Sequence, residues 1–163
     1  MEKGNIQIYY GVGRGKTNAA LGNALRAANE GKTVYVIQFL KGKLNHSMDF
    51  YKRLEPEIKF FCFEKSADRY DELTEDEKKE AIQNMKNGIS FARKVLTTGE
   101  CNVLILDEVL GLVDNGVISA EELEAVAKSK SDEVEVIFTG RVLEESVRPF
   151  ADEIYNIIAE KSE

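Results

Sequence analysis

The chain has 163 residues, of which 43% are hydrophobic and 31% charged, and its formal net charge is −7. These values are typical of one globular domain that is long enough to bury a core, and the acidic balance disfavours nucleic acid as the main partner. Since the sequence has neither a charged-then-apolar leader nor an apolar run long enough to span a membrane, we expect a cytoplasmic protein without a membrane partner.

The first predicted element is a strand at Ile6–Tyr10, where apolar and polar residues alternate. It leads into the sequence Gly-Val-Gly-Arg-Gly-Lys-Thr at 11–17, and residues 18–28 have the pattern of a helix. Strand, glycine-rich turn and helix in this order are the context of a phosphate-binding loop. The turn's amides and the helix N-terminus attract anions, Lys16 adds a mobile cation, and Thr17 offers a hydroxyl that can bind Mg²⁺.

The glycine pattern departs from the usual one. Tyr10 occupies the position of the first glycine, and the glycines stand at alternate positions instead. A strand–turn–helix corner that needs glycine only for close packing is the alternative. Packing, however, gives no reason for Lys16 and Thr17 at the start of the helix.

A mostly apolar run at 34–40 predicts a second strand that is buried on both faces. The polar loop that follows contains Lys41, Lys43 and His46. In open α/β sheets, loops at the carboxyl ends of the strands surround the ligand, so these side chains are candidates for a site. An ordinary solvated loop is an equal alternative.

The central third of the chain predicts three elements. They are a short helix at 48–54, a strand at 58–63 and a long helix that ends near Leu96. The long helix begins at a capping box made by Thr74 and Glu77.

An apolar run at 103–106 ends abruptly in two carboxylates, Asp107 and Glu108. In phosphate-loop proteins, an acidic residue at the end of a neighbouring parallel strand completes the Mg²⁺ shell. The predicted metal ligands are therefore Thr17, Asp107 and Glu108. The alternative is a solvent-facing pair of acids that starts a helix.

After a short helix at 109–113, a second capping box at Ser119 and Glu122 opens another helix, which runs to about Lys130. A strand at 134–139 then ends in Thr-Gly-Arg, which would bring Arg141 to the ligand edge, where it could pair with a phosphate.

A last helix at 144–150 and a last strand at 153–158 complete the predicted elements. Strands and helices alternate throughout, so we expect an α/β fold. It is a single phosphate-loop (RecA-like) domain over residues 1–163, with a mostly parallel central sheet and helices on both faces.

Cys62 and Cys101 lie in or beside apolar runs and are predicted to be buried thiols. With His46 as the single histidine, the sequence contains no zinc-ligand spacing.

Taken in order, four motifs resemble the ATP:corrinoid adenosyltransferases of the CobA/BtuR type. They are the glycine loop, Val-Ile-Gln-Phe-Leu-Lys-Gly at 36–42, Leu-Asp-Glu at 106–108 and Thr-Gly-Arg at 139–141. The resemblance covers nearly the whole chain, and members of this family share the shortened glycine pattern.

The resemblance implies an enzyme that transfers the 5′-deoxyadenosyl group of ATP to the Co(I) of a reduced corrinoid and releases triphosphate, with Mg²⁺. It makes Lys16 and Glu108 the catalytic residues, and a homodimer would be in keeping with the family. The residues expected to contact the nucleotide are Gly11, Val12, Gly13, Arg14, Gly15, Lys16, Thr17, Asn18, Gln38, Lys41 and Arg141.

Two departures from the family leave alternatives open. Family members continue past the last strand with a basic, glycine-rich segment, whereas this sequence stops at Glu163. Some members also carry a Phe-Thr-Trp-like loop after the third strand, where Tyr70 is the only aromatic residue here. The alternatives are a phosphate-loop ATPase or kinase of unknown substrate, and a non-catalytic relative that binds ATP or a corrinoid.

Overall fold

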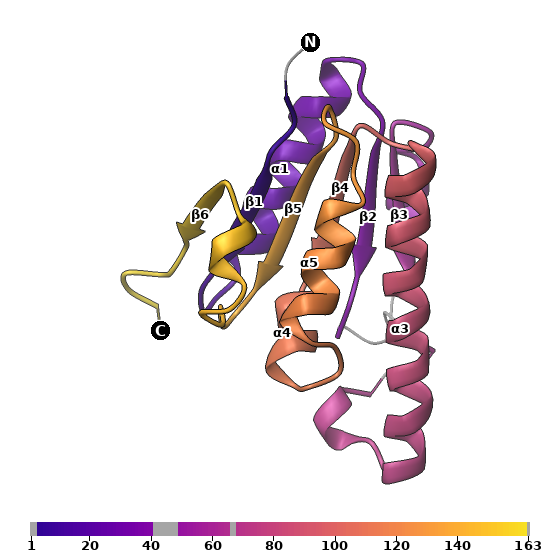
Figure 1. The fold of residues 1–163 in the computed structure, drawn as a ribbon, viewed down its shortest axis with the longest axis vertical. Coiled ribbons are helices and arrows are strands. Elements are labelled where there is room, and N and C mark those ends of the chain that lie inside the picture. The colour runs from indigo at the N-terminus through magenta and orange to yellow at the C-terminus, as the bar shows by residue number, and fades with distance from the viewer. Residues whose placement is uncertain (1–2, 41–48, 66–67, 163) are drawn as a thin grey trace.

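The computed structural model describes residues 3–40, 49–65 and 68–162, and these build one six-stranded sheet in the order β3-β2-β4-β5-β1-β6 (Figure 1). The pairings between neighbouring strands are parallel. The strands are β1 Ile6–Tyr10, β2 Val34–Gln38, β3 Ile58–Cys62, β4 Val103–Asp107, β5 Glu135–Gly140 and β6 Glu153–Asn156. The helices are α1 Gly15–Asn29, α2 Asp49–Lys52, α3 Glu75–Thr98, α4 Leu110–Asp114 and α5 Ala120–Lys128.

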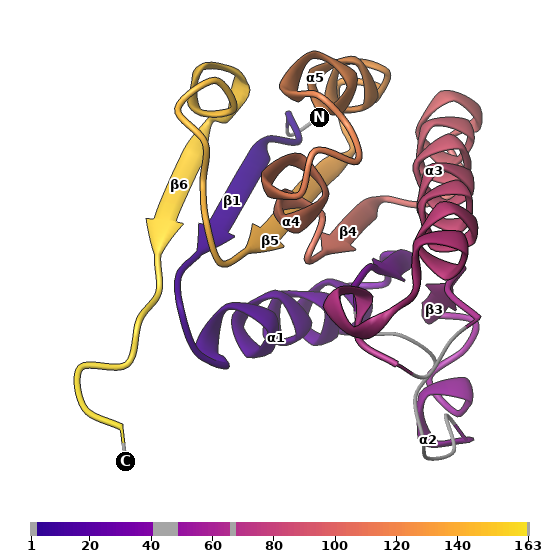
Figure 2. The same ribbon diagram turned by 90° about the horizontal axis from the view of Figure 1, so that it is seen from below.

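Helices cover both faces of the sheet, as predicted. Figure 2 shows α1 under one face and α3, α4 and α5 over the other. The face that packs on α1 presents Val36, Ile105 and Ile137. The opposite face presents Ile37, Leu106 and Phe138. Side chains therefore alternate between two cores along each strand, and the central strands β2 and β4 are buried at every position.

The long helix α3 begins and ends at the predicted signals. The Thr74 hydroxyl accepts a hydrogen bond from the Glu77 amide, and the Glu77 carboxylate accepts one from the Thr74 amide. These bonds to Thr74 lower the pKa of Glu77. At the other end, Gly99 takes the left-handed conformation with φ 69°, which glycine adopts without a steric penalty.

The predicted helix at 144–150 is wrong. Only a short 3₁₀ turn, Arg148–Phe150, forms there. Pro149 has no amide hydrogen and disfavours the α conformation of the residue before it, so an α-helix does not continue through this position. The last strand is also shorter than predicted, because its pairing with β1 ends at Asn156, where β1 gives way to the glycine loop.

Only one of the two cysteines is buried. Cys101 lies in the core, and desolvation raises the pKa of its thiol to about 12. The prediction for Cys62 is wrong, because this residue is exposed at the end of the edge strand β3. Among the described helices, none has the combination of length and apolar character that crossing a bilayer requires.

Candidate nucleotide-binding site

The glycine loop lies between β1 and α1 at the carboxyl edge of the sheet. Gly11 and Gly13 have φ values of 144° and 115°, which side chains other than glycine rarely adopt. A Cβ on Gly11 would lie 2.1 Å from the carbonyl oxygen of Ile157, so close packing explains this glycine. A Cβ on Gly13 would meet no atom of the described residues within 4 Å. Packing alone therefore does not account for the loop.

Lys16 is buried, with 5% of its surface exposed, and its side chain turns back over the loop. Its Nζ donates a hydrogen bond to the Gly13 carbonyl oxygen at 2.9 Å and lies 3.2 Å from Glu108 Oε1. A buried ammonium group needs such partners because it has lost its water shell. The pair places one positive and one negative side chain at the opening of the loop.

Asp107 is the second carboxylate in this region and is almost fully buried. The Thr17 hydroxyl donates to its Oδ1 at 3.0 Å, and the Thr139 hydroxyl donates to the same oxygen at 2.7 Å. Thr17 therefore contacts the carboxylate of Asp107, while Glu108 contacts Lys16. The two consecutive acids reach two consecutive residues of the loop.

The strand that carries these acids is not the neighbour of β1, which corrects the sequence-based expectation. β5 lies between β1 and β4 in the sheet. The gap is spanned by Thr139 near the end of β5, which accepts a hydrogen bond from the Glu108 amide at 2.9 Å in addition to its bond to Asp107. Its place in the Thr-Gly-Arg motif was the one signal that pointed to this residue.

Among the described residues, two other than glycine have left-handed backbones, Leu40 with φ 62° and Glu108 with φ 65°. Each follows a strand end closely, β2 and β4 respectively, at the edge that holds the glycine loop. Such conformations cost on the order of 1–3 kcal/mol and tend to cluster at functional sites. At Glu108 the turn sends consecutive carboxylates in different directions.

The oxygen donors around the loop suit Mg²⁺. Thr17 offers a hydroxyl, and Asp107 and Glu108 offer carboxylates, which are hard oxygen ligands. Within the described parts of the chain, no group of three or more His, Cys, Asp or Glu side chains is arranged to hold a metal ion alone. The donor set therefore fits an ion whose remaining ligands come from water and phosphate, as is usual for Mg²⁺ with nucleotides.

The other residues predicted to contact the nucleotide differ in burial, and one of them is not described. Gln38 is buried and in register with Asp107. Val12, Arg14 and Asn18 are exposed. Lys41 lies outside the described residues.

A hollow of about 440 Å³ adjoins the loop. Its lining includes Val12, Glu108 and Arg141 together with Tyr70 from the segment before α3. Arg141, from the Thr-Gly-Arg motif, thus lines this hollow, and its contact with a nucleotide stays a prediction.

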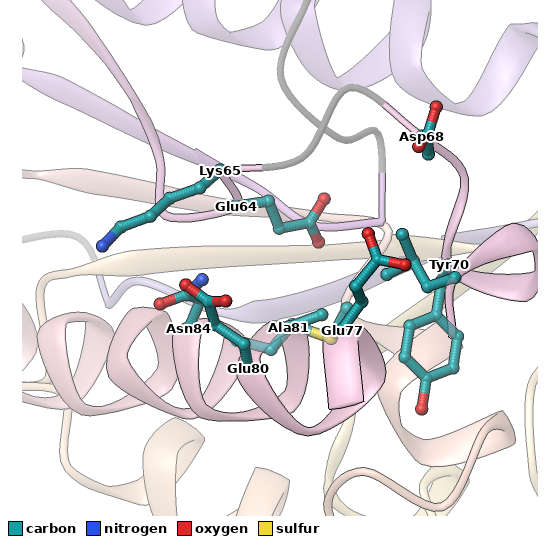
Figure 3. Close-up of a pocket in the computed structure, with 10 residues that line it drawn as sticks. Glu64, Lys65, Asp68, Tyr70, Glu77, Glu80, Ala81 and Asn84 are labelled. Carbon is teal, nitrogen blue, oxygen red and sulfur yellow. The ribbon is translucent and has the colours of Figure 1, made fainter. Parts of the chain in front are cut away.

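Tyr70 also lines a second hollow, of about 240 Å³. Figure 3 shows the side chains that surround it. Its side chains come from the segment after β3 and from the first turns of α3. Among the described residues that line it, four are acidic, Glu64, Asp68, Glu77 and Glu80, and one is basic, Lys65. A negative lining is unfavourable for a polyphosphate, whereas the glycine loop offers backbone amides and Lys16.

The fold and the loop together define a phosphate-loop protein of the RecA-like class. A KaiC-like protein of Pyrococcus horikoshii, PH0186, has a similar structure, with a TM-score of 0.61 at 13% sequence identity, covering 100% of this chain and 76% of that one. The cytoplasmic domain of EssC has a TM-score of 0.51 at 16% identity, covering 98% of this chain and 32% of that one. At these identities the likeness concerns the fold alone.

The chain belongs to the ATP:corrinoid adenosyltransferase BtuR/CobO/CobP family, whose model matches residues 2–163. The corrinoid adenosyltransferase of Escherichia coli K12 is 28% identical over 153 residues, which cover 94% of this chain and 76% of that protein. The uncharacterized protein all2391 of Nostoc sp. PCC 7120 is 31% identical over 163 residues, covering 91% of this chain and 42% of that protein. This chain therefore spans less than half of the Nostoc protein. The family resemblance read from the motifs is confirmed.

Proposed function

We propose that this chain transfers the 5′-deoxyadenosyl group of ATP to the cobalt of a reduced corrinoid and releases triphosphate. The observation that carries the proposal is the pairing of Lys16 with Glu108 and of Thr17 with Asp107 at the glycine loop of a member of this family. These groups converge where a polyphosphate would lie against the loop amides.

In the proposed reaction, the electron pair of Co(I) attacks C5′ of the ribose. A cobalt–carbon bond forms, the C5′–oxygen bond breaks, and its electron pair leaves with the triphosphate. No proton moves at these atoms, so the site needs no general base. What it must stabilise is the negative charge that gathers on the leaving group.

The residues of the loop would supply that stabilisation. Lys16 would turn from Glu108 and the Gly13 carbonyl to the phosphates, and the amides of residues 13–17 would donate to them. Mg²⁺, when bound, neutralises part of the phosphate charge, and Thr17, Asp107 and Glu108 are the residues that would hold it or its waters. Gln38 and Arg141 would contact the nucleotide from the neighbouring strand ends.

We assign the corrinoid to the hollow beside Glu108. This hollow is open at the carboxyl edge of the sheet and adjoins the loop, so a second substrate placed there can approach the ribose. Val12 and Val142 present exposed apolar surface at its wall, with 60% and 49% of their surfaces accessible. The apolar wall suits a large ring system, and Arg141 suits its polar side groups. A homodimer stays a prediction.

One experiment tests the transfer. The chain is incubated with ATP, Mg²⁺ and a chemically reduced corrinoid, while the corrinoid spectrum and the phosphate products are followed together. We expect the alkylated corrinoid to appear in equal amount with triphosphate and without ADP. Tight binding of ATP or corrinoid with neither product would support the non-catalytic alternative.

A second candidate function is ATP hydrolysis, and one observation favours it. Glu108 follows directly after Asp107 and lies beside Lys16, where a carboxylate could position a water against the terminal phosphate. ADP and phosphate released at the same rate with and without corrinoid would support hydrolysis and contradict the transfer.

A further inference from the structure

Thr139 connects the two acids of the site to the strand that separates them from the glycine loop. The residue is fully buried near the end of β5. Its hydroxyl donates to Asp107 Oδ1 at 2.7 Å and accepts from the Glu108 amide at 2.9 Å. The hydroxyl of Thr139 thus donates its proton to the carboxylate of Asp107, and one of its lone pairs accepts from the backbone amide of Glu108.

The strand register explains this position. Leu106 is paired with Phe138, so Asp107 and Thr139 are level at the ends of their strands. Ile105 and Ile137, two residues earlier, belong to the core that packs on α1, and alternation puts Asp107 and Thr139 on that same face. On the other side of β5, Tyr9 of β1 is in register with Thr139, close to the start of the glycine loop. Thr139 is therefore the side chain of β5 that lies between the loop strand and the acid strand.

The Glu108 amide makes this bond in an unfavourable backbone conformation. With φ 65°, Glu108 lies in the left-handed region, which a residue with a Cβ adopts only where its surroundings hold it there. Thr139 holds the amide on one side of the turn, and the Glu108 carbonyl accepts from the Gly111 amide at 3.0 Å on the other.

We propose that Thr139 is a positioning residue that aims the two carboxylates at the glycine loop. It orients Asp107 Oδ1 toward the Thr17 hydroxyl and fixes the turn from which the Glu108 side chain reaches Lys16. This inference rests on the proposed function for its effect on Mg²⁺ and turnover. Its structural part, the hold on the Glu108 amide, is independent of that function.

Substitutions at one position separate the hydroxyl from the shape. Thr139→Val keeps the shape and removes the hydroxyl. Thr139→Ser and Thr139→Ala differ from each other by a single oxygen, so they decide the question even if the valine variant does not fold. Ile137→Val is the matched control, since it trims a fully buried side chain on the same face of the same strand.

The readout is the Mg²⁺ concentration that half-saturates the effect of Mg²⁺ on binding of a fluorescent ATP analogue. We expect Thr139→Val and Thr139→Ala to raise it by about 10–100-fold, as when the partner of a metal ligand is removed, with kcat lowered in parallel. Binding in EDTA should change little, because the loop amides and Lys16 stay. Thr139→Ser and Ile137→Val should behave like the wild type.

Hydrogen exchange at the Glu108 amide gives a second readout that needs no nucleotide. Exchange should be slow in the wild type and in Thr139→Ser, and fast in Thr139→Ala. Equal Mg²⁺ requirements and equal amide exchange in the alanine and serine variants would overturn the inference. If the wild type bound no nucleotide, the proposed function and the Mg²⁺ part of this inference would fail, while the exchange experiment would still decide whether Thr139 holds the turn.

Discussion

The ion pair between Lys16 and Glu108 predicts opposite effects for two substitutions on nucleotide binding. In the free protein, Lys16 Nζ lies 3.2 Å from Glu108 Oε1 and donates to the Gly13 carbonyl. Phosphate must therefore compete with Glu108 for the ammonium group. Lys16→Met removes the cation itself, whereas Glu108→Gln removes only the charge of the competitor.

The magnitudes follow from the kinds of bond involved. A hydrogen bond to a charged group contributes about 1.5–3 kcal/mol, so Lys16→Met should weaken ATP binding by about 10–150-fold. Glu108→Gln replaces a charged partner of Lys16 by a neutral one, a difference of about 1 kcal/mol, so ATP in EDTA should bind about fivefold more tightly. With Mg²⁺ the sign should reverse, because the variant has lost a proposed oxygen ligand of the ion.

Titration of a fluorescent ATP analogue, in EDTA and in Mg²⁺, measures both effects. Lys32→Met is the control for the loss of one positive charge. Lys32 precedes β2, so it lies at the opposite edge of the sheet, and it forms a solvent-exposed ion pair with Glu30. It should change the affinity little. Weaker binding of ATP to Glu108→Gln in EDTA would refute the reasoning, since Glu108 would then support the loop instead of competing with phosphate.

Three further predictions concern stability and reactivity. Gly22 lies on the exposed side of α1, and a Cβ added there would meet no described atom within 4 Å. Because alanine favours the helix over glycine, Gly22→Ala should raise Tm by about 2–4 °C and leave the ATP affinity unchanged. A loss of affinity would contradict this. Iodoacetamide should label the exposed Cys62 in the native protein, whereas the buried Cys101 should be labelled only in denaturant. Mass spectrometry of the labelled peptides measures this, and labelling of Cys101 in the native protein would contradict the prediction. Burial raises the pKa of Glu135 above its ordinary value of 4.5, so the folded protein binds a proton on this carboxylate more tightly than the unfolded chain does. Ionisation of Glu135 at neutral pH therefore lowers the free energy of unfolding. Glu135→Gln should therefore raise the urea midpoint at pH 7 and lose that advantage as the pH falls through the raised pKa toward 4.5; an unchanged midpoint at pH 7 would contradict this.

The elements that could be predicted from the sequence are those with local signals. The glycine loop follows an alternating strand and precedes a helix, so its position between the two follows from a dozen consecutive residues. The capping box at Thr74 and Glu77 is equally local. The helix expected at 144–150 shows the limit of such signals, since the backbone restrictions of Pro149 leave only a short 3₁₀ turn there.

The left-handed conformation of Glu108 had no signal in the sequence. Glycine or asparagine usually marks such a position, and here a glutamate occupies it. Its conformation depends on bonds to Thr139 and Gly111, both made by the folded chain. The different directions of Asp107 and Glu108 could therefore be seen only in the structure.

The role of Thr139 depended on one fact that the sequence does not contain, the order of the strands. Given that β5 lies between β1 and β4, the register and the alternation of side chains put residue 139 beside Asp107 on the face that packs on α1. A carboxylate buried at that point needs hydrogen-bond donors, because an unpaired buried charge is strongly destabilising. An apolar residue at this position could not donate to the carboxylate. The hydroxyl at 139 thus satisfies the buried acid at 107, and both lie beside the glycine loop because β5 separates β4 from β1.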